Sequence, residues 1–96
     1  MPKITITGTF LLASANNHVN VIVARNDPNK YFTQNSYDDS FKEDHDDVVS
    51  GLTYDVSIAG ETPGKFRLQI TGDVVVPFDH TYDGPIFQDT PTFKVK

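Results

Sequence analysis

No cysteine and no tryptophan occur among the 96 residues of the chain, which contains a single methionine. Without cysteine, no disulfide can reinforce the small core of a chain this short, so stability must come from packing, from a ligand or from neighbouring domains. The sequence also lacks any apolar run near the ~20 residues that a helix needs to cross a bilayer. We therefore expect no insertion into a membrane.

A signal-peptide segment is also missing, because Met1-Pro2-Lys3 leads directly into a strand-like pattern rather than into an apolar stretch. A cytoplasmic protein and a fragment of a secreted or cell-surface protein both fit this observation, so the localisation stays open. No Asn-x-Ser/Thr sequon is present, and we expect no N-glycosylation in either case.

Basic residues are scarce beside acidic ones, and 8 lysines and arginines against 13 aspartates and glutamates give a formal net charge of −5. Most of the excess lies between residues 38 and 47, where six acidic residues and one lysine give −5. The residues before this run carry a net +2 and those after it a net −2. Such a surface repels phosphates and anionic lipid, so nucleic acid is not expected as a partner.

Residues 1–96 are expected to form one domain, because domains of about 100 residues are common. Apolar and polar residues alternate with a period of two almost throughout, which is typical of β-strands. We expect strands over residues 3–12, 19–24, from 31 onward, 54–58, 66–70, around 74–78, and over 86–87 and 92–96. The alternation predicts that eight side chains point inward: Ile4, Ile6, Val21, Tyr54, Val56, Phe66, Leu68 and Ile70.

The segments between these strands carry turn-forming residues. We expect turns over residues 25–30 and 60–64, the second of them closing a hairpin, and a loop over 79–85. Residues 34–50 are expected to form a long loop or an irregular edge strand, with one helical turn from the Ser40-x-x-Glu43 capping pattern as the alternative. The pattern predicts an all-β fold, an antiparallel Ig-like (Greek-key) β-sandwich of about seven strands.

The stretch VVSGLTYDVSIAG over residues 48–60 resembles the late strands of Ig-like, fibronectin-III-like and transthyretin-like β-sandwich domains. In those domains, a Leu-Pro-Gly turn leads into a strand that bears a tyrosine and then alternating apolar residues. Here Leu52 and Tyr54 are only two residues apart and enclose no Pro-Gly, so the spacing predicts no tyrosine at the strand corner. The resemblance implies an architecture and carries no function.

The acidic run is the most unusual feature of the chain, because clustered carboxylates can supply several of the six to eight oxygen ligands of Ca²⁺. The candidate ligands are Asp38, Asp39, Asp44, Asp46 and Asp47. The EF-hand pattern fails, since Asp44-x-Asp46 is not followed by a third ligand and a glycine. A solvated loop whose charge prevents edge association explains the same residues. We expect no cofactor, with Ca²⁺ as the alternative.

Catalytic chemistry is not expected from this sequence. His18, His45 and His80 are scattered, and we interpret them as surface histidines rather than as metal ligands or members of a catalytic triad. The only glutamates are Glu43 and Glu61, and a small sandwich has little room for two carboxylates that face each other across a cleft. No glycine-rich phosphate-binding loop is present.

Aromatic residues form two groups that could contact a ligand, one just before the acidic run and one near residue 82. The candidate ligand-binding residues are Tyr31, Tyr37, Phe41 and Tyr82, although core packing explains the same aromatics. We therefore expect a non-catalytic accessory, adhesion or structural module that engages a protein or glycan partner. The alternative is a Ca²⁺-dependent ligand-binding domain, possibly specific for carbohydrate, that uses the 38–47 loop.

Overall fold

The computed structural model describes residues 2–25 and 30–96 of the chain. The described residues form strands and no helix. The strands are β1 (Ile4–Phe10), β2 (His18–Arg25), β3 (Tyr31–Tyr37), β4 (Phe41–His45), β5 (Thr53–Glu61), β6 (Lys65–Gly72), β7 (Phe78–Asp83), β8 (Ile86–Asp89) and β9 (Thr92–Lys94). It follows that this part of the chain contains no helix long and apolar enough to cross a membrane.

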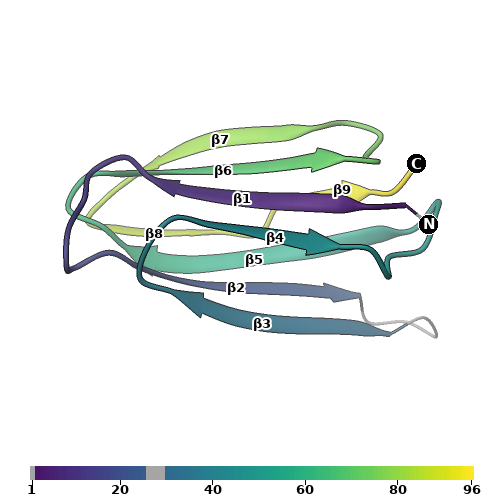
Figure 1. Ribbon diagram of the computed structural model, residues 1–96, viewed down its shortest axis with the longest axis horizontal. Helices are drawn as coiled ribbons and strands as arrows, with labels where there is room; N and C mark the ends of the chain where they lie inside the picture. The colour runs from purple at the N-terminus through teal and green to yellow at the C-terminus, as the bar shows by residue number, and fades with distance from the viewer. Residues whose placement is uncertain (1, 26–29) are drawn as a thin grey trace.

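The strands build two antiparallel sheets that pack face to face (Figure 1). One sheet has the order β4-β1-β6-β7 and the other β3-β2-β5-β8. Strands β8 and β9 share one edge of β5, where β9 pairs with residues 53–55 and β8 with residues 58–61. The predicted all-β sandwich is therefore confirmed, with nine strands in the described part of the chain rather than about seven. The Ig-like, Greek-key connectivity stays a prediction.

The core lies between the sheets and includes the eight inward residues that the alternation predicted. All eight residues named above are essentially inaccessible to solvent. Aromatic rings fill the centre around Phe66, whose ring centroid lies 4.9 Å from that of Phe10 and 4.8 Å from that of Phe87. Gly8 of β1 leaves room for this cluster, because a Cβ atom there would lie 2.2 Å from the ring of Phe41.

Three local predictions were wrong, and the alternatives for residues 34–50 are decided in favour of an edge strand, which is β4. The strand expected around residues 74–78 is absent, because Val74 forms only an isolated bridge with Val95 and β7 begins at Phe78. Residues 79–85 do not form a loop, because β7 spans residues 78–83 and pairs with β6. The turn at residues 60–64 does not close a hairpin, since β5 and β6 lie in different sheets and the chain crosses between the layers there. The turn predicted over residues 25–30 falls mostly on residues 26–29, outside the described residues.

Most of the crossings between the sheets occur at one end of the sandwich. The links β1–β2, β3–β4, β5–β6 and β7–β8 all lie at the left of Figure 1. The crossing from β4 to β5 lies at the other end, where the Tyr54 hydroxyl accepts a hydrogen bond of 2.9 Å from the Val49 amide. The spacing of Leu52 and Tyr54 predicted no corner tyrosine. The turn over residues 49–52 nevertheless brings the Val49 amide within hydrogen-bond distance of the Tyr54 hydroxyl.

Candidate functional site: a polar cleft between two edge strands

Strands β3 and β4 are the outer strands of the two sheets on the same side of the sandwich. The register pairs the buried valines of β2 with polar residues of β3, as Val19–Tyr37, Val21–Asn35 and Val23–Thr33. Paired residues of an antiparallel ladder project from the same face of the sheet, so these side chains point toward the interior. The interior side of this edge is therefore polar rather than apolar.

These residues open into a cleft of about 350 Å³ beside β4. One wall consists of Tyr31, Thr33 and Asn35, and the other consists of residues 43–47. The volume lies within the range of small-molecule sites. The alternation of β4 directs Glu43 and His45 inward, and their exposed fractions are 8% and 5%. The prediction that His45 is a surface histidine was wrong.

A hydrogen-bond network joins the two walls of the cleft. Glu43 Oε1 lies 2.8 Å from His45 Nε2, and Glu43 Oε2 accepts from the Tyr37 hydroxyl and, at 3.2 Å, from the Asn35 amide. The Tyr31 hydroxyl donates to Asp47 Oδ1 at 2.8 Å and lies 2.8 Å from His45 Nδ1. The network ties both edge strands to the turn that follows β4.

The network shifts the pKa values of its members. Burial by itself would raise the pKa of Glu43, but hydrogen bonds with His45, Tyr37 and Asn35 outweigh it and hold that pKa below its ordinary value. Burial raises the pKa of Tyr37, and its hydrogen bond to Glu43 adds to the effect. The pKa of Tyr31 is raised by burial and by its bond to Asp47. At neutral pH the network therefore holds Glu43 as a carboxylate and both tyrosines as protonated phenols.

One polar atom on the β3 wall remains without a partner. Thr33 Oγ1 is buried and accepts or donates no hydrogen bond within the described residues. An unsatisfied buried hydroxyl is unfavourable by about 1–3 kcal/mol. Stability does not explain a polar residue at this position.

The candidate metal ligands are spread along β4 rather than gathered at one point. Asp44 also lines the cleft, but its carboxylate is directed to the outer side of its sheet, where it accepts a hydrogen bond of 2.8 Å from the Thr5 hydroxyl. Asp38 lies beyond the opposite end of β4 and contacts His18 Nδ1 at 2.6 Å, and Asp39 accepts from the Ser40 amide. Asp46 and Asp47 line the cleft. The described residues contain no group of three or more histidines and acids that could hold a metal ion.

This dispersal leads to a prediction for Ca²⁺. We expect saturating Ca²⁺ to leave the melting temperature within a few degrees of that in Mg²⁺ at matched ionic strength, because screening does not distinguish the two ions. Binding at a hundredfold excess over Kd would instead add about 2.7 kcal/mol, or roughly 10 °C or more for a domain of this size. Differential scanning fluorimetry measures the difference. A large Ca²⁺-specific rise, lost in an Asp44→Asn/Asp46→Asn variant, would restore the metal-dependent alternative.

The candidate ligand-binding aromatics divide between two sides of the molecule. Tyr31 lines the cleft, whereas Tyr37 reaches it only through its hydrogen bond to Glu43. Phe41 stacks on Tyr37 with ring centroids 4.0 Å apart and packs against the core. Tyr82 is on β7, in the sheet edge away from β4, where its hydroxyl donates to Asp89 Oδ2 at 2.6 Å. The structure thus groups three of the four aromatics and separates the fourth.

Four residues of the cleft were not predicted from the sequence as site residues, which are Thr33, Asn35, Glu43 and His45. A signal was available: Thr33 and Asn35 continue the phase of Tyr31 and Tyr37, and Glu43 and His45 continue that of Phe41. Polar residues in the inward phase of a strand are unusual, because burial of a polar group is unfavourable without a partner. The pattern was visible only as a break in the apolar alternation.

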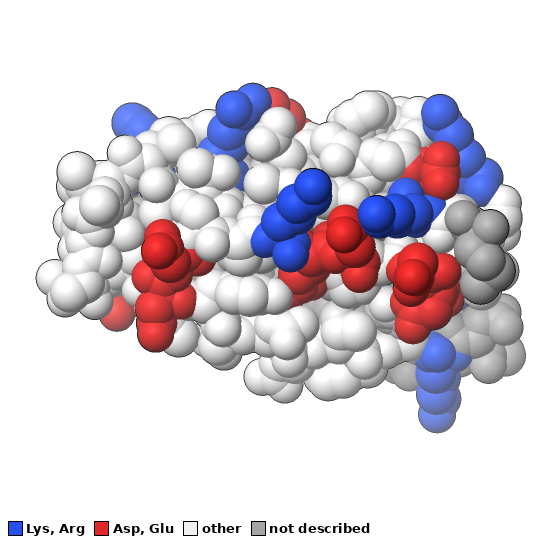
Figure 2. Space-filling model, viewed as in Figure 1, with Lys and Arg blue, Asp and Glu red and all other residues white. Residues whose placement is uncertain are grey.

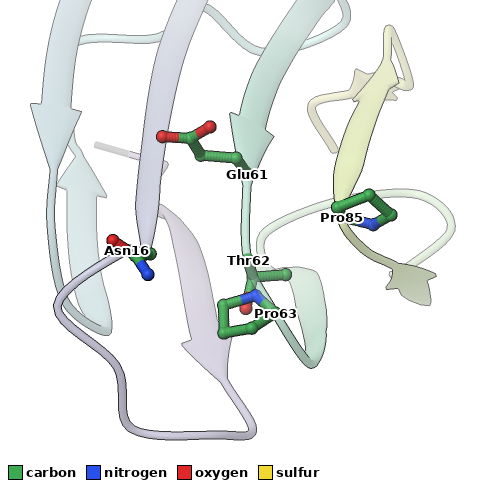
Figure 3. Close-up of a pocket in the computed structure, with 5 residues that line it drawn as sticks. All are labelled: Asn16, Glu61, Thr62, Pro63 and Pro85. Carbon is green, nitrogen blue, oxygen red and sulfur yellow. The ribbon is translucent and has the colours of Figure 1, made fainter.

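A second hollow of about 270 Å³ lies at the end where the sheet crossings gather (Figure 3). Asn16, Glu61, Thr62, Pro63 and Pro85 line it. Beneath it, the buried Thr62 hydroxyl donates to Asn17 Oδ1 at 2.7 Å, which ties two of the links together. This hollow has one charged residue, and its polar groups serve to hold the links in place.

The charge distribution favours the cleft over this hollow as a site. Figure 2 shows acidic side chains in a row that follows the line of β4. Neither lysine nor arginine lines the cleft within the described part of the chain.

Comparison of the chain with protein-family models, with curated proteins and with solved structures gave no match.

Proposed function

We propose that the protein is a non-catalytic β-sandwich module that engages a partner, a protein or a glycan, through the cleft between β3 and β4. The observation that carries the proposal is the polar lining of this cleft. Two edge strands turn polar residues toward the apolar core, and they leave a hollow of about 350 Å³ between them.

The chemistry of the cleft supports binding rather than turnover. The His45 ring lies between Glu43 and the Tyr31 hydroxyl, so both of its nitrogens are engaged by groups of the protein itself. A general base needs a free position within hydrogen-bond reach of the substrate proton. Glu43 is likewise engaged at both oxygens. The network fixes the shape of the cleft, and the groups at its rim are left to contact a ligand.

A titration of the ¹⁵N-labelled protein tests the proposal. The probes are short peptides of either charge, common mono- and disaccharides, and Ca²⁺. We expect at least one peptide or sugar to cause saturable amide shifts confined to residues 31–37 and 41–47. An Asn35→Phe variant, which fills the cleft, should lose these shifts, and a Thr81→Phe variant on the exposed face of β7 should keep them.

Turnover assays with ester, phosphate and glycoside substrates complete the test, and we expect background rates. Activity that disappears with a single histidine or aspartate substitution would overturn the non-catalytic assignment. Saturable shifts that map only to the hollow at the crossing end, or to β7 and β8, would overturn the assignment of the cleft.

A further inference from the structure

We infer that the partner contributes an extended, basic segment that pairs with β3 as an additional strand and directs lysine or arginine side chains toward the acidic rim of the cleft. The inference rests on the proposed function, because it specifies the chemistry of the partner at the same site. Three features of the described residues support it: the open edge of β3, its lack of charge, and the negative rim beside it.

The first feature is the unpaired edge of β3. Its seven residues pair with β2 on one side, and no described residue makes a main-chain hydrogen bond on the other side. A strand edge of this kind presents a row of free amide and carbonyl groups. Such an edge is the surface to which an extended peptide adds in β-strand addition.

The second feature is the composition of β3, which differs from that of the other edge strands. Natural proteins protect exposed edges with charged side chains, with proline or by keeping the strand short. Strand β4 carries Lys42 and Asp44 outward, β7 carries Asp79 and Asp83, and Pro91 separates the short β8 from β9. The sequence of β3 is YFTQNSY, without charge or proline, and its Phe32 side chain is 66% exposed. This edge therefore lacks the devices that prevent pairing.

The third feature is the charge beside the open edge. Every second side chain of a strand added to β3 would lie on the cleft side of the sheet, because side chains alternate between the two faces. On that side Asp46 and Asp47 stand at the rim above the buried Glu43, and no lysine or arginine among the described lining residues balances them. A basic side chain at alternate positions complements this rim and an acidic one does not.

A second copy of this chain is a poorer occupant of the edge. Each chain carries a formal net charge of −5. Pairing of β3 with β3 would bring two acidic segments to the same side of a joined sheet, where like charges repel. An uncharged β3 from a second copy would also offer no cation to the rim. A basic segment of another protein can pair with the free edge of β3 and also place cations beside the acidic rim.

The experiment uses the full chain and a seven-residue peptide of alternating lysine and threonine, followed by fluorescence anisotropy at low salt. We expect saturable binding that weakens as the salt concentration rises. In a parallel titration of the ¹⁵N-labelled protein, the peptide should shift the amide signals of residues 31–37 and 43–47. A glutamate–threonine peptide should not bind. Two further lysine peptides carry N-methyl groups on the odd-numbered or on the even-numbered residues, so that each blocks the amides along one edge of the peptide strand. At least one of them should bind at least tenfold more weakly than the unmethylated peptide, because only one edge of the added strand pairs with β3.

Matched variants locate the charge effect. The Asp46→Asn/Asp47→Asn variant should bind the lysine peptide several-fold more weakly. The Asp79→Asn/Asp83→Asn variant changes the net charge equally but on β7, and it should bind as the unchanged protein does. Equal losses in the two variants would show that the peptide responds to overall charge, and the inference would fall.

The remaining outcomes separate the inference from the proposed function. Full binding by both N-methylated peptides would overturn strand pairing while leaving the cleft as a binding site. If the lysine peptide does not bind but a sugar shifts the amide signals of the cleft, the inference of a basic partner falls and the proposed function stands. If sedimentation shows concentration-dependent dimers that the Phe32→Lys variant does not form, the occupant of the β3 edge is a second copy of the chain, and the inference of a basic partner falls. If no probe shifts β3 or β4, both proposals fall.

Discussion

Replacing Glu43 by alanine is expected to lower the free energy of unfolding by about 2–4 kcal/mol, because the substitution removes one half of a buried polar pair. His45 would lose the acceptor for Nε2, and the Tyr37 hydroxyl would lose its only hydrogen-bond partner among the described residues. For a domain of this size, the change corresponds to a fall in melting temperature on the order of 10–20 °C. Urea unfolding and differential scanning calorimetry measure it.

The adjacent residue provides a matched control. Asp44 is on the same strand but faces solvent, where it accepts a hydrogen bond from Thr5 and lies 3.6 Å from the Lys3 ammonium. Exposed ion pairs contribute between zero and about 1 kcal/mol, so Asp44→Ala should have a small effect. Equal losses from Glu43→Ala and Asp44→Ala would show that the inward network contributes little to stability.

Glu43 also makes stability depend on pH in a defined direction. Its pKa in the folded protein lies below the ordinary value of 4.5. The stabilisation is therefore fully present above about pH 4.5 and is lost as the pH falls through the folded-state pKa. Exposed acids such as Asp79 and Asp83 also have lowered pKa values, through hydrogen bonds with Arg67 and Lys65, so they add to the acid loss. Comparison of the unchanged protein with Glu43→Gln isolates the contribution of Glu43, and identical pH profiles would contradict it.

Replacing Phe66 by alanine is expected to cost about 3–5 kcal/mol, the range for truncation of a fully buried aromatic residue. The Phe66 ring is inaccessible to solvent and stacks against Phe87, with Phe10 and Phe41 on its other sides. A loss of this size is a large part of the total stability of a small domain, which is commonly 5–15 kcal/mol. Near-ultraviolet circular dichroism and urea unfolding would report the loss of packing.

Two further variants keep this prediction decisive. Phe66→Leu retains most of the apolar volume and should remain folded, with a loss well below that of Phe66→Ala. Phe32→Ala removes the same number of atoms from an exposed position and should change stability by less than about 0.5 kcal/mol. If Phe66→Ala and Phe32→Ala destabilise the protein equally, the assignment of the core is wrong.

The inward-facing residues were predictable from the sequence because the period of two is a local property. Any strand that buries one face shows this alternation, whichever strand lies next to it. Ile4 and Ile6 of β1, and Leu68 and Ile70 of β6, are buried as their spacing indicated. Residues 19–24 are partly apolar on both faces, which is typical of a central strand, and β2 lies between β3 and β5.

Edge strands were harder to predict, because they bury less apolar surface than central strands. In β7 the inward phase reads Phe78, His80, Tyr82, and the polar middle residue concealed the alternation. In β4 the inward phase reads Phe41, Glu43, His45, and the surrounding acids left a long loop and an irregular edge strand as alternatives. A strand at the edge can hold polar inward residues when a neighbouring network or solvent satisfies them.

The sequence by itself determined the all-β fold class, eight of the inward core residues and the negative charge of residues 38–47, since each follows from residue type and spacing. The tertiary structure alone decided which strands are neighbours, because the alternation of β5 and β6 is equally compatible with one sheet or two. It also decided the site. Tyr31 and Asp47 are sixteen residues apart in the chain, and the crossing from β3 to β4 places them within one hydrogen bond. Long-range pairing of this kind depends on how the sheets stack, and no local pattern records it.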